Sequence, residues 1–144
     1  MVTAESCTGG WVSEAVTAIA GSSEWFDRGY VTYSNRAKHE MLGVTDATLE
    51  NAGAVSEPTV IEMAQGALRA SGADVAVAVS GIAGPGGASP GKPVGLVCFA
   101  WAIKGKPLTA KTFHLRGDRQ GVRQQAVVIA LKGLLDALLA GNPA

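Results

Sequence analysis

One short run of residues limits the fold of this chain more than any other, because it has the pattern of a strand buried on both faces. Residues 74–80, Asp-Val-Ala-Val-Ala-Val-Ser, are mostly small and apolar and are bounded by turn residues. Such a strand is typical of the centre of a sheet that carries helices on both sides. A long loop rich in glycine and proline follows at residues 81–93. A loop of this length after a buried strand is more often functional than a plain linker.

The rest of the hydrophobic pattern supplies the other elements of an α/β fold. The predicted strands end near residue 3 and cover 28–33, 74–80, 94–103 and 108–115, the last two forming an antiparallel hairpin. The predicted helices run from Gly9 to about Ala20 and over 36–42, 45–53, 56–71 and 118 to Asn142-Pro143. This order predicts a three-layer α/β/α sandwich with a mixed sheet, a single domain over residues 1–144. The first strand is short for a central one, so we expect further residues upstream.

A strand-to-helix corner at residues 4–10, Ala-Glu-Ser-Cys-Thr-Gly-Gly, concentrates reactive side chains. Gly9 and Gly10 open the next helix, so free backbone N–H groups and the positive end of the helix dipole face the same region as Ser6 and Thr8. Such a corner stabilises an anion or a developing oxyanion. The plainer alternative is a threonine-capped helix with glycines for close packing.

Lys38 is the candidate base for a serine nucleophile, since the two histidines, His39 and His114, lie in unrelated segments. It follows the second predicted strand, and the carboxyl ends of parallel strands share one sheet edge, so it can meet Ser6 there. A lysine base must be neutral, which requires burial or a cationic neighbour, and Tyr33 is placed to relay or orient the proton. The alternative is an ordinary exposed helix lysine.

Arg119 and Arg123 stand four residues apart at the start of the last predicted helix, where positive side chains oppose the helix dipole. Two guanidinium groups on one helix face suit a phosphate or a carboxylate, with Arg116 as a further donor. The alternative is a solvated face balanced by Asp118.

Composition argues against several kinds of partner. The formal net charge is +0 at pH 7, so no basic surface for nucleic acid or anionic lipid is indicated. Cys7 and Cys98 lack metal-ligand spacing, and no apolar run approaches the roughly 20 residues that span a bilayer. We therefore expect a cytoplasmic protein without a metal, a cofactor or a membrane partner. The apolar hairpin with Trp101 suggests a homodimer.

Seven motifs in fixed order give a more specific identification. They are Ala-Glu-Ser-Cys-Thr-Gly-Gly at 4–10, Gly-Ser-Ser at 21–23, Tyr-Ser-Asn-x-x-Lys at 33–38, Gly-Ala-Val-Ser-Glu at 53–57, Ser-Gly-Ile-Ala-Gly-Pro at 80–85, Lys-Pro-Val-Gly at 92–95 and Gly-Asp-Arg-x-x-x-Arg at 117–123. Over nearly its whole length the chain resembles the CinA carboxy-terminal-domain family, whose characterised members are nicotinamide-nucleotide amidohydrolases.

This resemblance implies deamidation of nicotinamide mononucleotide to nicotinate mononucleotide and ammonia, a step that recycles pyridine nucleotide toward NAD. It also implies metal-independent hydrolysis by a Ser/Lys pair, with Lys38 and Tyr33 in the matching motif. Ser6 and Ser23 both stand in family motifs. We prefer Ser6 as nucleophile, because Ser23 follows the first helix and falls at the opposite sheet edge. Backbone N–H groups near Gly9-Gly10 or Gly81 would hold the oxyanion, and the expected substrate-binding set is Thr8, Gly9, Gly10, Ser80, Gly81, Gly84, Arg119 and Arg123.

Two other functions fit the sequence. Cys7 is intrinsically a better nucleophile and stands beside Ser6, which permits a thiol amidohydrolase. An extended strand end, however, turns the Cys7 side chain toward the core. The alternative from another class is a nucleotide-binding regulatory module that keeps the pocket but performs no turnover.

Overall fold

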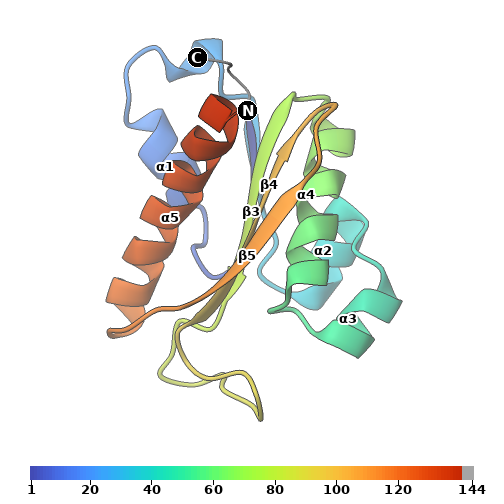
Figure 1. Ribbon diagram of the computed structural model, residues 1–144, viewed down its shortest axis with the longest axis vertical. Coiled ribbons are helices and arrows are strands. Elements are labelled where there is room, and N and C mark those ends of the chain that lie inside the picture. The colour runs from blue at the N-terminus through green and yellow to red at the C-terminus, as the bar shows by residue number, and fades with distance from the viewer. Residues whose placement is uncertain (141–144) are drawn as a thin grey trace.

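The computed structural model describes residues 1–140, which form one five-stranded sheet with helices around it (Figure 1). The strand order is β2-β1-β3-β4-β5; β2, β1 and β3 are parallel, whereas β4 is antiparallel to both β3 and β5. The strands are β1 (Val2–Glu5), β2 (Arg28–Val31), β3 (Val75–Gly81), β4 (Leu96–Ile103) and β5 (Thr109–His114). The helices are α1 (Trp11–Thr17), the 3₁₀ helix η1 (Ser22–Glu24), α2 (Asn35–Leu42), α3 (Asp46–Ala52), α4 (Glu57–Ser71) and α5 (Arg119–Ala140).

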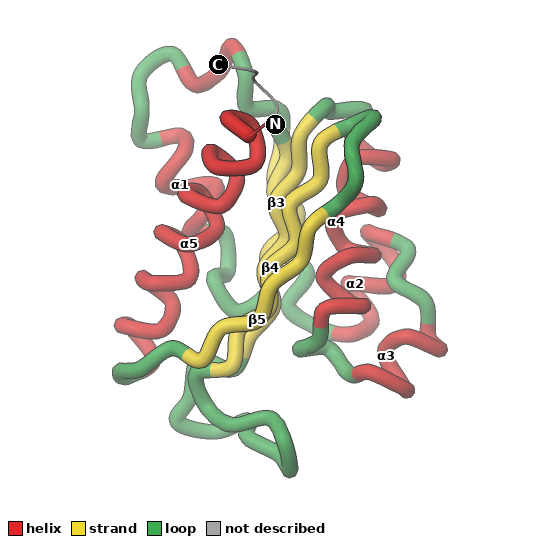
Figure 2. Tube along the Cα trace, in the orientation of Figure 1, coloured by secondary structure: helices red, strands yellow, loops and turns green. Residues whose placement is uncertain are grey.

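Helices cover both faces of the sheet, and each face has its own apolar core. α1 and α5 lie on one side, and α2, α3 and α4 lie on the other (Figures 1 and 2). Alternation along β3 sends Ala76 and Ala78 into the core beneath α4, and Val77 and Val79 into the core beneath α5. β3 is therefore buried on both faces, as the sequence predicts for residues 74–80. The predicted fold class, a three-layer α/β/α sandwich with a mixed sheet, is confirmed.

A close approach between α2 and α4 fixes the helix that carries Lys38. A Cβ atom on Gly66 of α4 would stand 1.8 Å from the carbonyl oxygen of Leu42 at the end of α2, so only glycine allows this contact. α2 begins at the cap residue Ser34, whose hydroxyl accepts a first-turn N–H at 3.0 Å. It ends at Gly43, which takes the left-handed conformation with φ 70°.

The predicted elements differ from the structure mainly at their ends. The helix that follows Gly10 ends at Thr17 rather than near Ala20. β2 ends at Val31, so Tyr33 lies beyond the strand and not within it. The predicted helix end at Asn142-Pro143 lies outside the described residues.

Trp101 points inward rather than toward a partner. Its side chain is 4% exposed, and its indole N–H donates to the carbonyl oxygen of Ala130 in α5 at 2.8 Å. The homodimer suggested by this residue stays a prediction. Within residues 1–140, none of the helices combines the length and the apolar character needed to cross a membrane.

Candidate active site

Ser6 and Lys38 meet at the carboxyl edge of the parallel strands. Ser6 directly follows β1, and its backbone N–H donates to Val79 of β3 at 3.0 Å, which holds it at the sheet edge. Lys38 reaches the same point from α2, and its Nζ donates to Ser6 Oγ at 2.9 Å and to the carbonyl oxygen of Thr32 at 2.8 Å. The meeting that parallel topology predicts for these two side chains is therefore present in the structure.

Lys38 is almost completely buried, with 1% of the residue exposed. Burial lowers the pKa of its ammonium group to about 8 from the usual 10.5, because the charged form loses water; the nearby Cys7 opposes part of this shift. No salt bridge to Lys38 is present among residues 1–140. The lysine can therefore become neutral near physiological pH, which a proton acceptor requires.

Glu5 organises the corner on the side of α1. Its carboxylate is 1% exposed and accepts four hydrogen bonds: from Thr8 Oγ1 at 2.6 Å, from Val12 N at 2.8 Å, and from the N–H and hydroxyl of Ser13 at 3.0 and 2.8 Å. These N–H groups belong to the first turn of α1. The protein's own carboxylate therefore occupies the helix start that the sequence suggested for an external anion.

Cys7 packs in the core, as the sequence predicts, although it also lines the pocket over Ser6. Its side chain is 5% exposed and belongs to the core beneath α5. Burial raises the pKa of the Cys7 thiol to about 11, although Arg123 and Lys38 oppose the shift. A thiol with this pKa is protonated near neutral pH, which makes it a poor nucleophile.

A pocket of about 290 Å³ opens over Ser6 and Lys38. Its wall includes the end of β3, where Ser80 is buried and donates from Oγ to the carbonyl oxygen of Ala54 at 2.8 Å. The pocket also takes in the first part of the long loop after β3. Seven of the predicted site residues line it: Ser6, Tyr33, Lys38, Ser80, Gly81, Gly84 and Arg119.

Tyr33 and Arg119 meet at the rim of this pocket. Arg119 Nη2 donates to the Tyr33 hydroxyl at 3.0 Å, and Nη1 donates to the carbonyl oxygen of Gly84 at 2.9 Å. Tyr33 is 61% exposed and forms no hydrogen bond with Ser6 or Lys38 in the described structure. Arg119 thus joins α5 to the long loop and to the segment after β2.

Five predicted site residues lie outside the pocket. Thr8 is buried against Glu5, and Gly9 donates its N–H to the carbonyl oxygen of Ser6 at 3.0 Å. Gly10 is the residue before α1, with φ 104°. Ser23 is in η1, which precedes the start of β2 and therefore lies at the opposite edge of the sheet from Ser6, as expected (Figure 1).

Arg123, the fifth, binds backbone rather than the pocket. Its Nε donates to the carbonyl oxygen of Cys7 at 3.0 Å, and its Nη2 donates to that of Thr8 at 3.2 Å. It lines an adjoining hollow between the long loop and α5, which Arg119 also lines.

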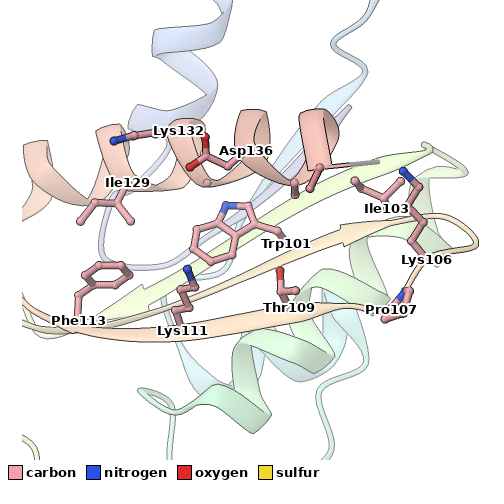
Figure 3. Close-up of a pocket in the computed structure, with 13 residues that line it drawn as sticks. Trp101, Ile103, Lys106, Pro107, Thr109, Lys111, Phe113, Ile129, Lys132 and Asp136 are labelled. Atoms are coloured by element: carbon pink, nitrogen blue, oxygen red, sulfur yellow. The ribbon is translucent and has the colours of Figure 1, made fainter. Parts of the chain in front are cut away.

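A larger groove, of about 590 Å³, lies elsewhere, between α5 and the β4–β5 hairpin (Figure 3). Its floor holds Trp101, Phe113 and Ile129, and lysines stand at its margin. None of the predicted site residues lines it. Residues 1–140 also contain no group of three or more His, Cys, Asp or Glu side chains that could hold a metal ion.

Sequence reasoning missed what Glu5 and Arg123 bind. In the sequence, Glu5 is one polar residue among several in the corner. Its only signal is a carboxylate seven residues before Val12, the first-turn residue whose N–H it accepts. Arg123 contacts a carbonyl oxygen 116 residues away in sequence, and no local pattern encodes such a contact.

The fold and the site together define an α/β domain with a buried serine–lysine pair at the carboxyl edge of its parallel strands. The sequence model of the CinA C-terminal domain matches residues 1–138, and the chain belongs to that family.

Similar proteins agree with this assignment. The nicotinamide-nucleotide amidohydrolase PncC of Enterobacter agglomerans is 63% identical over 133 residues, covering 92% of this chain and 80% of that protein. The protein of the same name from Escherichia coli K12 is 56% identical over 140 residues, covering 96% and 84%. The crystal structure of competence damage-inducible protein A from Klebsiella pneumoniae has a TM-score of 0.94 at 43% identity, covering 98% of this chain and 87% of that one.

Proposed function

We propose that this protein is a metal-independent amidohydrolase that deamidates nicotinamide mononucleotide to nicotinate mononucleotide and ammonia. The observation that carries the proposal is the 2.9 Å contact between Ser6 Oγ and the buried Lys38 Nζ, with the pKa of the lysine lowered to about 8. The names of the similar proteins support the substrate. We place the reaction in the recycling of pyridine nucleotide toward NAD, in the cytoplasm.

Acylation follows from the geometry of this pair. Neutral Lys38 accepts the Ser6 proton while Ser6 Oγ attacks the carboxamide carbon, forming the C–O bond of a tetrahedral intermediate. The Lys38 ammonium then gives its proton to the amide nitrogen, the C–N bond breaks, and ammonia leaves. The carbonyl oxygen of Thr32 accepts a hydrogen bond from Nζ throughout, which keeps the amine aimed at Ser6.

Gly81 offers a backbone donor for the oxyanion of that intermediate. Val79 O accepts the Ser6 N–H, and Ile82 N donates to β4, so strand alternation directs the Gly81 N–H toward the β1 side. In a regular parallel ladder the Gly81 N–H would donate to Ser6 O. Here Ser6 O accepts the Gly9 N–H instead. We therefore assign the oxyanion site to Gly81 rather than to Gly9-Gly10.

Close packing explains why position 81 is glycine. A Cβ atom there would stand 2.7 Å from Val97 Cγ2 and 3.1 Å from Cys7 Sγ. A side chain at this position would displace Val97 or Cys7 and disturb the backbone beside Ser6.

Deacylation reverses the proton path. A water molecule replaces ammonia, neutral Lys38 accepts a proton from it, and the resulting hydroxide attacks the ester carbon. Cleavage of the ester C–O bond returns the proton from Lys38 to Ser6 and releases the pyridine carboxylic acid, which loses its remaining proton to solvent to give the carboxylate.

Arg119 is our candidate for the 5′-phosphate of the nucleotide. It stands at the pocket rim, is exposed, and lines both the pocket and the adjoining hollow. A phosphate at the rim would compete with the Tyr33 hydroxyl and Gly84 O for the N–H donors of Arg119. Its bonds to the guanidinium would be charge-assisted. This proposal does not use Arg123 as a phosphate ligand, the role predicted from the sequence, because its side chain already binds two carbonyl oxygens.

The deciding experiment measures ammonia release from nicotinamide mononucleotide by the wild-type protein and by Ser6→Ala and Ser23→Ala. We expect turnover by the wild type and by Ser23→Ala, and none by Ser6→Ala with its fold intact. An active Ser6→Ala protein with an inactive Ser23→Ala protein would move the nucleophile to Ser23. Tight binding of the nucleotide without any ammonia release would instead identify a binding module.

A further inference from the structure

We propose that Arg123 is a positioning residue that, together with Glu5, fixes the backbone corner carrying Ser6. The inference rests on the proposed function, because it assigns Arg123 a part in the reaction of Ser6 without contact with substrate. It gives Arg123, one of the two arginines that the sequence predicts to bind phosphate, a different role.

Arg123 crosses from α5 to the corner and binds it by two donors of one guanidinium group. Nε donates to Cys7 O at 3.0 Å and Nη2 donates to Thr8 O at 3.2 Å. The guanidinium carbon also lies 5.3 Å from the centre of the Trp11 ring, a cation–π distance. Two directional bonds and one stacked face define the position of the group.

Glu5 binds the same stretch of chain by accepting hydrogen bonds from the donor groups of that stretch. Its carboxylate accepts from the hydroxyl of Thr8 and from the first-turn N–H groups of Val12 and Ser13. The corner thus has its carbonyl oxygens held by a cation and its donor groups held by an anion. Both bonds of Arg123 and all bonds of Glu5 fall within seven residues after Ser6.

These contacts bear on Ser6 because they hold the backbone that directly follows it. Ser6 bonds the end of β3 through its N–H, and its carbonyl oxygen accepts the Gly9 N–H within the turn itself. The carbonyl oxygen of Cys7 accepts from Arg123, and that of Thr8 accepts from both Arg123 and the Trp11 N–H. Loss of Arg123 would release Cys7 O, the carbonyl oxygen next to Ser6, and let Ser6 Oγ shift relative to Lys38 Nζ.

The guanidinium group of Arg123 also packs against the glycine turn. A Cβ atom on Gly9 would lie 3.7 Å from Arg123 Nη2, so the guanidinium packs directly over the glycine turn. A lysine ammonium is a point donor and cannot make two parallel bonds to adjacent carbonyl oxygens.

The test compares Arg123→Gln and Arg123→Lys with the wild type on nicotinamide mononucleotide and on its dephosphorylated riboside. We expect kcat to fall by the same factor on both substrates, on the order of 10–100-fold for Arg123→Gln and less for Arg123→Lys, with KM within about twofold. Lys132→Gln, which removes a cation from the same helix beside the distant groove, is the control and should match the wild type. A rise in KM confined to the nucleotide, or an unchanged kcat, would overturn the proposal.

A second measurement separates this proposal from the proposed function. The rate at which phenylmethylsulfonyl fluoride labels Ser6, followed by mass spectrometry, reports nucleophile alignment without any substrate. We expect Arg123→Gln to slow labelling about as much as it lowers kcat. If the wild type is labelled but releases no ammonia, the proposed function fails and the labelling rates decide the role of Arg123. If Ser6 is not labelled and ammonia is not released, both proposals fail. If Arg123→Gln does not fold, the labelling rate of Arg123→Lys is compared with that of the wild type instead.

Discussion

The strongest prediction concerns the protonation of Lys38, because the structure gives it a magnitude. A group with a pKa of about 8 is neutral in about one molecule in eleven at pH 7, whereas a lysine at 10.5 is neutral in about one in three thousand. Burial therefore raises the neutral fraction about 300-fold at pH 7. Raising the pH above 7 can increase the neutral fraction of Lys38 by about another tenfold.

We expect kcat/KM for ammonia release to rise tenfold per pH unit below about pH 8 and to level off above it. The assay is steady-state ammonia release between pH 6 and pH 10, on protein whose fold is checked by circular dichroism at each end of the range. A flat profile, or one that rises only near pH 10.5, would refute a neutral Lys38 as the base.

Two variants complete this test. Lys38→Arg keeps the charge but cannot lose its proton, so turnover should fall by roughly 10²–10⁴-fold. Lys38→Ala leaves a space in which small primary amines should restore part of the rate in proportion to their concentration. Lys104→Ala, in an exposed turn, is the matched control. Near-normal turnover by Lys38→Arg would remove Lys38 from the mechanism.

The same pKa shift predicts how stability depends on pH. The pKa of folded Lys38 lies below its unfolded value, so between about pH 8 and 10.5 the unfolded state binds more protons and stability rises with pH. Below pH 8 the buried ammonium destabilises the fold by at most about 3 kcal/mol. The difference in unfolding free energy between wild type and Lys38→Met isolates this contribution, and a difference that does not change across the window would contradict it.

Three further predictions test other parts of the site and fold. Arg119→Gln should raise KM for the nucleotide roughly 10–100-fold by loss of a charge-assisted bond and leave the riboside unchanged; equal losses on both would assign Arg119 to structure. Cys7→Ala should retain most activity, and iodoacetamide should inactivate the wild type slowly, since a thiol with a pKa of about 11 is ionised in about one molecule in a thousand at pH 8. A Cys7→Ala protein as inactive as Ser6→Ala would restore the thiol mechanism. Gly66→Ala should lower the free energy of unfolding by about 3 kcal/mol or more in a urea titration, because the new methyl group meets Leu42 O; an unchanged midpoint would show that α2 and α4 can separate freely.

Sequence reasoning located the layers and the pairing of Ser6 with Lys38 because both follow from topology. An apolar run such as residues 74–80 requires cover on both faces, and parallel strands bring their carboxyl ends together. No side-chain detail is needed for either conclusion. The sequence left open whether Lys38 is buried or is an ordinary exposed helix lysine, since α2 has the composition of an exposed helix; in the structure it is buried.

The charged contacts around the corner depend on distances that sequence does not contain. Thr8 and the helix start were predicted to face an anion, and the structure shows that Glu5 already fills that place. Arg119 and Arg123 look equivalent on a helical projection. Arg119 stands at the pocket rim and donates to Gly84 O in the loop after β3, whereas Arg123 donates to Cys7 O in the corner.

The separation of Ser6 and Lys38 by 32 residues has a consequence for newly made chains. Before β1 and β2 pair, the serine is an ordinary alcohol and the lysine is a hydrated ammonium ion that holds its proton at cellular pH. In the proposed mechanism, reactivity therefore arises only when α2 closes over the sheet edge and removes water from the amine. The same mechanism predicts that a partly folded molecule does not react with amides or esters, so acyl transfer to Ser6 would require the completed fold.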